Sequence, residues 1–331
     1  MLFSMLTSPT ARLFAGGTAF VLTLLGLIFG RKFLPKDQGR EFAVNGALSK
    51  GKDRGAGIIL IIALIVSGLL YIPLSVEYVI YFAALFLEML SGYLDDASEK
   101  PWGEAIKGII DFVIAVGVSV TVYLYNGGTV RMATLPVAFT LPAWAYIALG
   151  TILIWVSINV TNCADGVDGL CTSMSMVSLG SVLAILWLVP QLRQTHAESM
   201  ELLVLMAIFV LIAYLWFNCS PSSMLMGDAG SRSLGLLLAL AFMICGDPFL
   251  FIPCAIMLII DGGLGLFKLT VLRVTKSKTF MKNIRTPIHD HARKNKGWSD
   301  TQVVTRFTLL QMLFSAAAVG LAIMSFQWIG A

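Results

Sequence analysis

Long apolar segments, separated by shorter polar ones, follow one another along almost the whole chain. Ten of these segments approach the length of about 20 residues that a helix needs to cross a bilayer. They lie at roughly residues 12–30, 56–73, 77–94, 107–125, 143–160, 170–189, 200–217, 233–247, 249–270 and 306–328. The eighth is short, and the sequence CGDPF separates it from the ninth. The pattern predicts an all-α polytopic integral membrane protein with about ten transmembrane helices.

Composition supports this prediction. The chain has 331 residues, of which 57% are hydrophobic and 13% are charged, and its mean hydropathy is +0.85, whereas soluble domains carry about 25% charged residues. The first apolar segment lacks the basic, apolar and cleavage-site order of a secretory signal, so we interpret it as a retained span. With no repeat or soluble domain in the sequence, we expect one transmembrane domain over residues 1–331, set in the lipid bilayer, with no nucleic acid partner.

Charge in the loops predicts the orientation. Seven Lys or Arg residues fall in the 31–54 loop and nine in the 271–306 loop, while Arg12, Arg131 and Arg193 stand on the opposite side. Because Lys and Arg gather in cytoplasmic loops, ten spans place both termini on the outer side. Most of the aspartates then fall in the cytoplasmic loops, which predicts an active-site cleft on the cytoplasmic face.

The first candidate site is SGYLDDASEKPWGEAIKG, residues 91–108, with Asp95 and Asp96 at the inner end of the third span. Adjacent carboxylates repel each other, and a nearby cation would relieve that cost. Lys107 is the basic candidate, since its position near the inner boundary lets it reach an anionic substrate. Asp111 lies four residues further along the same helix, so we also expect an ion pair between Lys107 and Asp111. The alternative interpretation of this stretch is a polar signal that ends a helix.

The second candidate site is NVTNCADGVDGL, residues 159–170. Asp165 and Asp168 are three residues apart and each is followed by a glycine, and Asn159 and Asn162 have the same spacing on one helix face. Asparagine supplies both a donor and an acceptor, which suits a nucleobase or a sugar. The alternative is an Asx-rich turn with helix caps.

The third candidate site is WFNCSPSSMLMGDAGSRSLG, residues 216–235. Asp228 lies beside Gly227, and Ser231 follows where a helix is expected to begin. The amides at a helix N-terminus hold phosphate well, and a carboxylate beside them can hold the Mg²⁺ that accompanies a phosphate. A capped turn is the alternative.

The fourth candidate site is RTPIHDHARKNKGWSDTQVVTRF, residues 285–307, in which His289 and His291 flank Asp290. We discount zinc here because the cysteines lie elsewhere and no third soft ligand is near. The basic residues around the histidines suit a polyphosphate, although most of them are also explained as ordinary positive charge on the cytoplasmic side.

These four clusters come from different cytoplasmic loops, and together they predict one cleft. Mg²⁺ needs only a few carboxylates together with substrate phosphates, and phosphoryl transfer depends mainly on positioning and charge neutralisation. The sequence therefore favours a membrane enzyme that joins a soluble phosphate donor to a lipid acceptor.

At these residues the chain resembles the polyprenyl-phosphate N-acetylhexosamine-1-phosphate transferases, over nearly its whole length. The pieces GYLDD, NVTNCADGVDGL and WFNCSPSSMLMGD are similar to the superfamily, and PIHDH followed by KGWSDTQVVTRF is similar to its muramoyl-pentapeptide branch. The resemblance implies a homodimer in the bacterial cytoplasmic (inner) membrane. It also implies Mg²⁺-dependent transfer of phospho-MurNAc-pentapeptide from UDP-MurNAc-pentapeptide to undecaprenyl phosphate, which gives lipid I and UMP in peptidoglycan synthesis.

The resemblance also implies roles for single residues. Asp95 matches the acid proposed to deprotonate the lipid phosphate, Asp96 a second essential acid, and Asp228 the Mg²⁺ ligand. Substrate-binding positions are matched by Lys107, Asn159, Asn162, Asp165, Asp168, Asn218, Gly227, Ser231, His289 and His291. An in-line attack and a two-step route through an aspartyl-phosphate are both open.

The chain departs from the family at several positions. Asp290 replaces the middle histidine of a triple histidine, and Leu225 stands where an aromatic is usual. The family's Thr-Pro-Thr-Met-Gly-Gly stretch is KDRGAGI at 52–58, so only Lys50 or Lys52 is carried over as a tentative substrate contact.

Two other functions compete with this interpretation. A GlcNAc-1-phosphate transferase of the same superfamily is the nearest, and PIHDH argues against it. A secondary transporter is the more distant one, but transporters usually bind substrate near the midplane between inverted repeats, whereas the polar groups here gather at one face.

Overall fold

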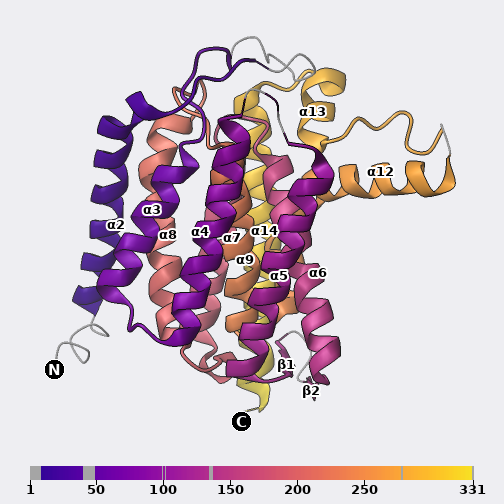
Figure 1. The fold of residues 1–331 in the computed structure, drawn as a ribbon. Helices are drawn as coiled ribbons and strands as arrows, with labels where there is room; N and C mark the ends of the chain where they lie inside the picture. Colours follow the sequence, from indigo (N-terminus) through magenta and orange to yellow (C-terminus); the bar gives the residue numbers. More distant parts are fainter. Residues whose placement is uncertain are drawn as a thin grey trace.

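The computed structural model describes residues 9–39, 49–98, 100, 102–133, 137–276 and 279–329, with the side chains of 326–329 left aside. It is a bundle of helices that run up and down beside one another (Figure 1). The long helices are α2 (Pro9–Gly30), α3 (Gly57–Tyr71), α4 (Val76–Asp96), α5 (Glu104–Asn126), α6 (Ala143–Ala164), α7 (Leu170–Leu188), α8 (Ala197–Asn218), α9 (Gly227–Ile244) and α14 (Asp300–Ile329).

Within the described residues, eight helices are long and apolar enough to cross a membrane, or nine if a bent pair counts as one span. The chain is therefore a multi-pass membrane protein, as its hydropathy predicts. The second expected span is α3, which has only 15 residues. The ninth expected span, 249–270, is not one straight helix, because Pro248–Cys254 and Ile256–Thr275 meet at 69°.

The broken span comprises several short pieces. The 3₁₀ turn η4 (Pro248–Leu250) leads into α10 (Phe251–Cys254) and α11 (Ile256–Leu258), and the π-helical turn η5 (Ile259–Gly263) leads into α12 (Leu264–Thr275). Helix α12 extends sideways from the bundle and carries no buried residue (Figure 1). Lys268, expected inside the span, lies on α12 and donates to the Ile284 carbonyl at 2.6 Å.

Helix α9 occupies the centre of the bundle. All of its residues are buried, and α4 and α6 pack along it. Gly57, the first residue of α3, lies so close to the backbone of Gly230 that a Cβ there would overlap it. Such contact between helix backbones needs small residues at the crossing, and it fixes the amino end of α9 against α3.

The two ends of the bundle differ. Strands β1 (Thr129–Met132) and β2 (Val137–Thr140) pair antiparallel at one end, between α5 and α6 (Figure 1). At the other end α4 and α6 finish, α5 and α9 begin, and the short helix α13 (Ile288–Lys296) lies. Helix α2 begins and α14 finishes at the hairpin end (Figure 1), while the first eight residues and the last two lie outside the described part.

Candidate active site

Three carboxylates and two cations meet where α4 ends and α9 begins. Asp95 and Asp96 are the last residues of α4, and Asp228 lies in the first turn of α9. The cations are Lys107, from the first turn of α5, and Arg54, from the segment that precedes α3. We refer to these five residues as the acid cluster.

The two adjacent acids face different partners, because successive side chains on a helix point about 100° apart. The Asp95 carboxylate accepts from the Trp102 backbone N–H at 2.5 Å and pairs with the Lys107 ammonium at 2.7 Å. The Asp96 carboxylate accepts from Arg54 Nε at 2.9 Å and from the Ala229 N–H of α9 at 3.3 Å. Each acid is thus neutralised by its own cation, and Asp96 also binds the amino end of α9.

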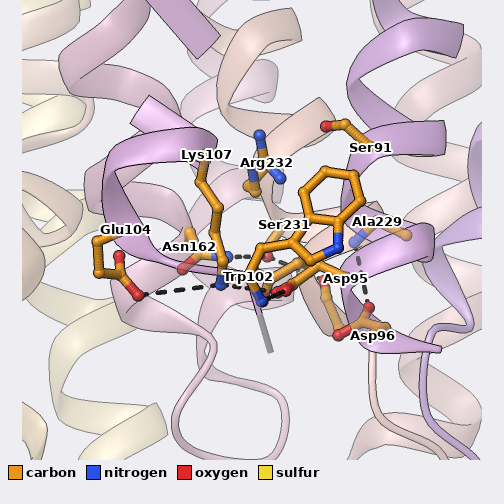
Figure 2. Close-up of polar contacts among 12 residues, drawn as sticks. Ser91, Asp95, Asp96, Trp102, Glu104, Lys107, Asn162, Ala229, Ser231 and Arg232 are labelled. Atoms are coloured by element: carbon orange, nitrogen blue, oxygen red, sulfur yellow. Dashed lines mark hydrogen bonds and ion pairs between the residues drawn. The ribbon is translucent and has the colours of Figure 1, made fainter. Parts of the chain in front are cut away.

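Lys107 connects Asp95 to Asp228. Its Nζ atom lies 2.7 Å from Asp95 Oδ2, 3.2 Å from Asp228 Oδ2 and 3.9 Å from Glu104 Oε1, and Figure 2 shows it between Glu104 and Asp95. The expected pair between Lys107 and Asp111 is wrong, since Asp111 pairs with Arg232 instead. Lys107 pairs with carboxylates of α4 and α9 instead, because α5 packs against both of these helices.

Backbone hydrogen bonds between two loop segments position Arg54 at the acid cluster. Residues 52–57 run beside residues 222–226, with Leu225 N–H donating to the Asp53 carbonyl and Ala56 N–H to the Leu225 carbonyl. Gly227 follows with φ of +72°, a backbone conformation that favours glycine, and a Cβ on it would overlap the Asp96 carboxylate. Its predicted role in substrate binding stays a prediction, while its backbone role is evident from this geometry.

Arg54 is held firmly. Its Nη1 pairs with Asp37 Oδ1 at 3.2 Å and its Nε with Asp96. Burial opposes its charged form, but the carboxylates of Asp96, Asp228 and Asp37 outweigh burial and raise the pKa of the guanidinium. Arg54 therefore supplies a permanent positive charge inside the acid cluster.

A second group of polar contacts lies beside the first. Lys52 Nζ lies 3.4 Å from Asp168 Oδ2 and donates to Ser222 Oγ at 2.9 Å, and the Ser222 N–H donates to Asp168 at 2.8 Å. Asn218 is buried and accepts from the Gly169 N–H at 3.0 Å, which anchors the start of α7. Two lysines were predicted as substrate contacts. Lys52 contacts the predicted binding residue Asp168, whereas Lys50 is exposed in a turn.

The remaining residues of the NVTNCADGVDGL stretch are divided between two places. Asn162 donates to Ser231 Oγ at 3.0 Å and lies close to Asp228, so it belongs beside the acid cluster (Figure 2). Asn159 donates to the Trp155 carbonyl of its own helix at 2.8 Å. Asp165 is the half-buried C-cap of α6.

His289 is positioned by an acid from the broken span. Its Nδ1 lies 2.7 Å from Asp261 Oδ2, and its backbone N–H donates to Asp261 Oδ1 at 2.7 Å. Both side chains are buried, and the His289 ring lies directly against Gly166. His291 instead accepts from the Arg285 N–H at 3.3 Å. The structure thus brings His289, and not His291, against the NVTNCADGVDGL stretch.

A buried ionic group lies one helical turn below Asp228. Arg232 of α9 pairs with Glu88 of α4 at 2.9 Å and with Asp111 of α5, and all three side chains are almost fully buried. The Nε and Nη1 atoms of Arg232 have no hydrogen-bond partner. We call these three residues the buried triad.

Sequence reasoning missed four residues of this region. Arg54 and Asp37 lie in a loop whose positive charge had an ordinary explanation, and Arg232 follows a motif that drew attention to Asp228. Asp261 lies inside the ninth expected span, and its partner His289 comes from a distant part of the sequence. Ionisable groups inside spans usually face the bundle interior and pair with an opposite charge, so Glu88, Asp111 and Asp261 were the signal to look for such partners.

No group of three or more His, Cys, Asp or Glu residues in the described part of the chain is arranged to hold a metal ion by itself. Mg²⁺ does not need such a cage, because it commonly binds through one or two carboxylates, waters and substrate phosphates. Asp228 fits that requirement, since its carboxylate is 13% exposed and its charged partners are the side chains of Lys107 and Arg54, at 3.2 Å and 4.0 Å.

The arrangement defines a helical membrane protein with an acid–base centre at one end of its bundle. A family model described as glycosyl transferase family 4 matches residues 78–246, which include Asp95, Asp96, Lys107 and Asp228. The chain belongs to this family, and within it to the phospho-N-acetylmuramoyl-pentapeptide transferases.

Relatives named phospho-N-acetylmuramoyl-pentapeptide-transferase match along most of the chain. The protein from Treponema pallidum is 33% identical over 304 residues, covering 87% of this chain and 83% of the relative. The Wolinella succinogenes protein is 27% identical, covering 92% and 93%, and the Rickettsia africae protein is 28% identical, covering 93% and 92%. The similarity therefore spans nearly the full length of both proteins.

Proposed function

We propose that this chain transfers phospho-MurNAc-pentapeptide from UDP-MurNAc-pentapeptide to undecaprenyl phosphate, giving lipid I and UMP. The observation that carries the proposal is the acid cluster, in which three carboxylates and two cations converge at the end of a membrane-spanning bundle. A soluble donor and a lipid acceptor can both reach such a position. Membership of the family makes the muramoyl donor the first choice over UDP-GlcNAc.

The chemistry assigned to the acid cluster is a displacement at phosphorus. An oxygen of the lipid phosphate attacks the β-phosphorus of the donor, a new P–O bond forms, and the bond to the bridging oxygen breaks as UMP leaves. Asp95 takes the proton of the lipid phosphate or orients its oxygen. Lys107, held by Asp95 and Asp228, offsets the charge that accumulates on the phosphates.

Asp228 is the residue that would hold Mg²⁺, with Asp95 and Asp96 close by. Bound there, Mg²⁺ would supply positive charge that stabilises the leaving UMP. Lys107 contacts the same carboxylate, so its ammonium lies where it can also bind the substrate phosphates.

The donor head group is assigned to the neighbouring polar residues. These residues lie in or next to the loop between α6 and α7, or contact residues that do: Asn162, Asp165, Asp168, Asn218, Lys52 and His289. Amide and carboxylate groups here suit the uracil, ribose and sugar hydroxyls. Asn159, His291 and Lys50 remain weaker candidates, because none of them makes a side-chain contact with this group in the structure.

The proposal includes a setting. The Lys- and Arg-rich loops lie at the same end of the bundle as the acid cluster, and the positive-inside rule supports a cytoplasmic position for that end. We propose the inner membrane of a bacterium as the location, as the family resemblance implies. We also expect a homodimer, as the family resemblance implies.

The test uses the purified full chain in detergent with Mg²⁺ and undecaprenyl phosphate. UDP-MurNAc-pentapeptide and UDP-GlcNAc are supplied in parallel, and UMP release is followed. UMP from the muramoyl donor alone is the expected result. Release from UDP-GlcNAc alone would move the protein to the sister activity, and release from neither, with the protein folded, would reopen the transporter alternative.

One substitution links the activity to the acid cluster. Asp95→Asn should abolish turnover while leaving UDP-sugar binding intact, because the amide cannot take up the acceptor proton. Asp300→Asn is the matched control, since Asp300 is a carboxylate of the same end of the bundle that pairs with Arg293 at 2.8 Å. Near-parental turnover in the Asp95 variant would sink the assignment.

A further inference from the structure

One edge of the Arg54 guanidinium faces Asp228 and makes no hydrogen bond. Its Nε and Nη1 atoms are taken by Asp96 and Asp37, at 2.9 Å and 3.2 Å. Its Nη2 atom lies 4.0 Å from Asp228 Oδ1, which is too far for a hydrogen bond. The free N–H groups therefore stand beside the carboxylate assigned to Mg²⁺.

The surroundings of Arg54 make it rigid. Its backbone N–H donates to the Pro35 carbonyl at 2.9 Å. Asp37, its second partner, accepts from Ser49 Oγ at 2.5 Å and from the Gly39 N–H at 3.1 Å. A guanidinium fixed in this way loses little conformational freedom when it binds a ligand.

The charged residues around Arg54 leave this region with a net negative charge. Asp37, Asp95, Asp96 and Asp228 carry four negative charges, and Arg54 and Lys107 carry two positive ones, so the site is short of positive charge before any phosphate arrives. The two cations lie at different oxygens of Asp228, Lys107 at Oδ2 and Arg54 at Oδ1. A phosphate beside Asp228 would therefore lie within reach of both.

We propose that Arg54 is a second phosphate-binding residue of this site, with its Nη2 donating to a phosphate oxygen held beside Asp228. The planar guanidinium is suited to that task, because it donates in a fixed fork geometry and stays charged. The proposal rests on the proposed function. It adds a residue that lies in the KDRGAGI stretch, where the family's Thr-Pro-Thr-Met-Gly-Gly has no charge.

The phosphate can belong to the donor or to the lipid, and binding assays separate the two. Arg54→Lys and Arg54→Gln are compared with the parent for the affinity of UMP and of uridine, and for KM of the donor and of undecaprenyl phosphate. A lost charge-assisted hydrogen bond should weaken phosphate binding about ten- to a hundredfold. Uridine lacks the phosphate, so its affinity should stay at the parental value and report that the nucleoside pocket is intact.

Each pattern of affinities and KM values identifies one role for Arg54. Weaker UMP binding and a higher donor KM assign the contact to the donor, and a higher KM for undecaprenyl phosphate with unchanged UMP affinity assigns it to the acceptor. A fall in kcat alone, with both KM values and the UMP affinity unchanged, would overturn the proposal and leave Arg54 as a residue that only positions Asp96.

Controls separate this proposal from the proposed function. Arg31→Gln removes another loop arginine that pairs with Asp53 at 2.9 Å, outside the acid cluster, and should leave all four quantities unchanged. If the Gln variant fails to fold, the Lys variant decides, because it keeps the charge that the buried carboxylates of Asp96 and Asp37 need. A parent protein that releases no UMP from either donor would refute the proposed function, while UMP and uridine binding would still test Arg54.

Discussion

Replacing Arg232 by methionine should destabilise the bundle strongly. Arg232 is the cationic partner of Glu88 and Asp111, and the side chains of the three residues are 3%, 0% and 3% exposed. Methionine fills a similar volume but leaves two carboxylates together in the centre of the protein without a positive charge. The loss is therefore electrostatic rather than a loss of packing.

The magnitude follows from the burial. Removing one partner of a buried ion pair costs about 3–5 kcal/mol, because the remaining charge is left uncompensated. At about 1.4 kcal/mol per tenfold change, the unfolding equilibrium should shift by roughly two to three and a half orders of magnitude. Replacing all three residues, in the combination Arg232→Met, Glu88→Gln and Asp111→Asn, removes the unpaired charge and should recover most of that loss.

The assay is denaturation in mixed detergent micelles, followed by tryptophan fluorescence and residual helicity. Arg12→Met is the matched control, because Glu201 pairs with Arg12 at 2.9 Å and keeps Arg193 at 3.8 Å when Arg12 is removed. Its cost should be clearly smaller. An Arg232→Met protein as stable as the parent, or a triple variant less stable than the single one, would refute the electrostatic account of the triad.

Two further predictions concern residues close to the candidate site. Gly57→Ala should lower both thermal stability and turnover, because its Cβ would overlap the Gly230 backbone and push α3 away from α9; Gly103→Ala, which meets nothing within 4 Å, is the control, and equal behaviour of the two variants in a thermal scan would contradict the close contact. Asp261→Asn should weaken donor binding with little loss of stability, because the His289 ring loses the carboxylate that orients it; an unchanged donor KM would show that this orientation is not used.

The length of the apolar segments was enough to predict the helices, but not whether each helix is straight. Segments at all ten expected positions are helical, yet the ninth bends by 69° between Cys254 and Ile256, directly after Pro253, in a run that still looks apolar. Hydropathy averages over a window and carries no information on bending. Hydropathy predicted ten spans, whereas eight helices of the described residues pass by length and composition, or nine if the bent pair counts as one span. The other expected span, α3, has only 15 residues.

The grouping of Asp95, Asp96, Lys107 and Asp228 was predictable, because each lies where a span meets the same side of the membrane. Their individual partners were not. The i, i+4 spacing favoured Lys107 with Asp111, but in a bundle the neighbouring helices offer closer charges, and Asp111 found Arg232. Likewise His196, an isolated histidine in the sequence, lies 2.8 Å from the buried Glu77 carboxylate. Pairing between distant segments depends on packing, which one sequence does not display.

The central position of α9 has a consequence for the way the protein meets different membranes. Some 94% of the apolar window of α9 is buried inside the bundle, against 28% for α2 and 28% for α14. Mismatch between protein and bilayer thickness acts on helices that touch lipid, which respond by tilting. The peripheral helices can therefore adjust to a thinner or thicker bilayer while α9, which carries Asp228 and Arg232, keeps its depth. The geometry around Asp228 would then stay the same when the lipid composition of the membrane changes.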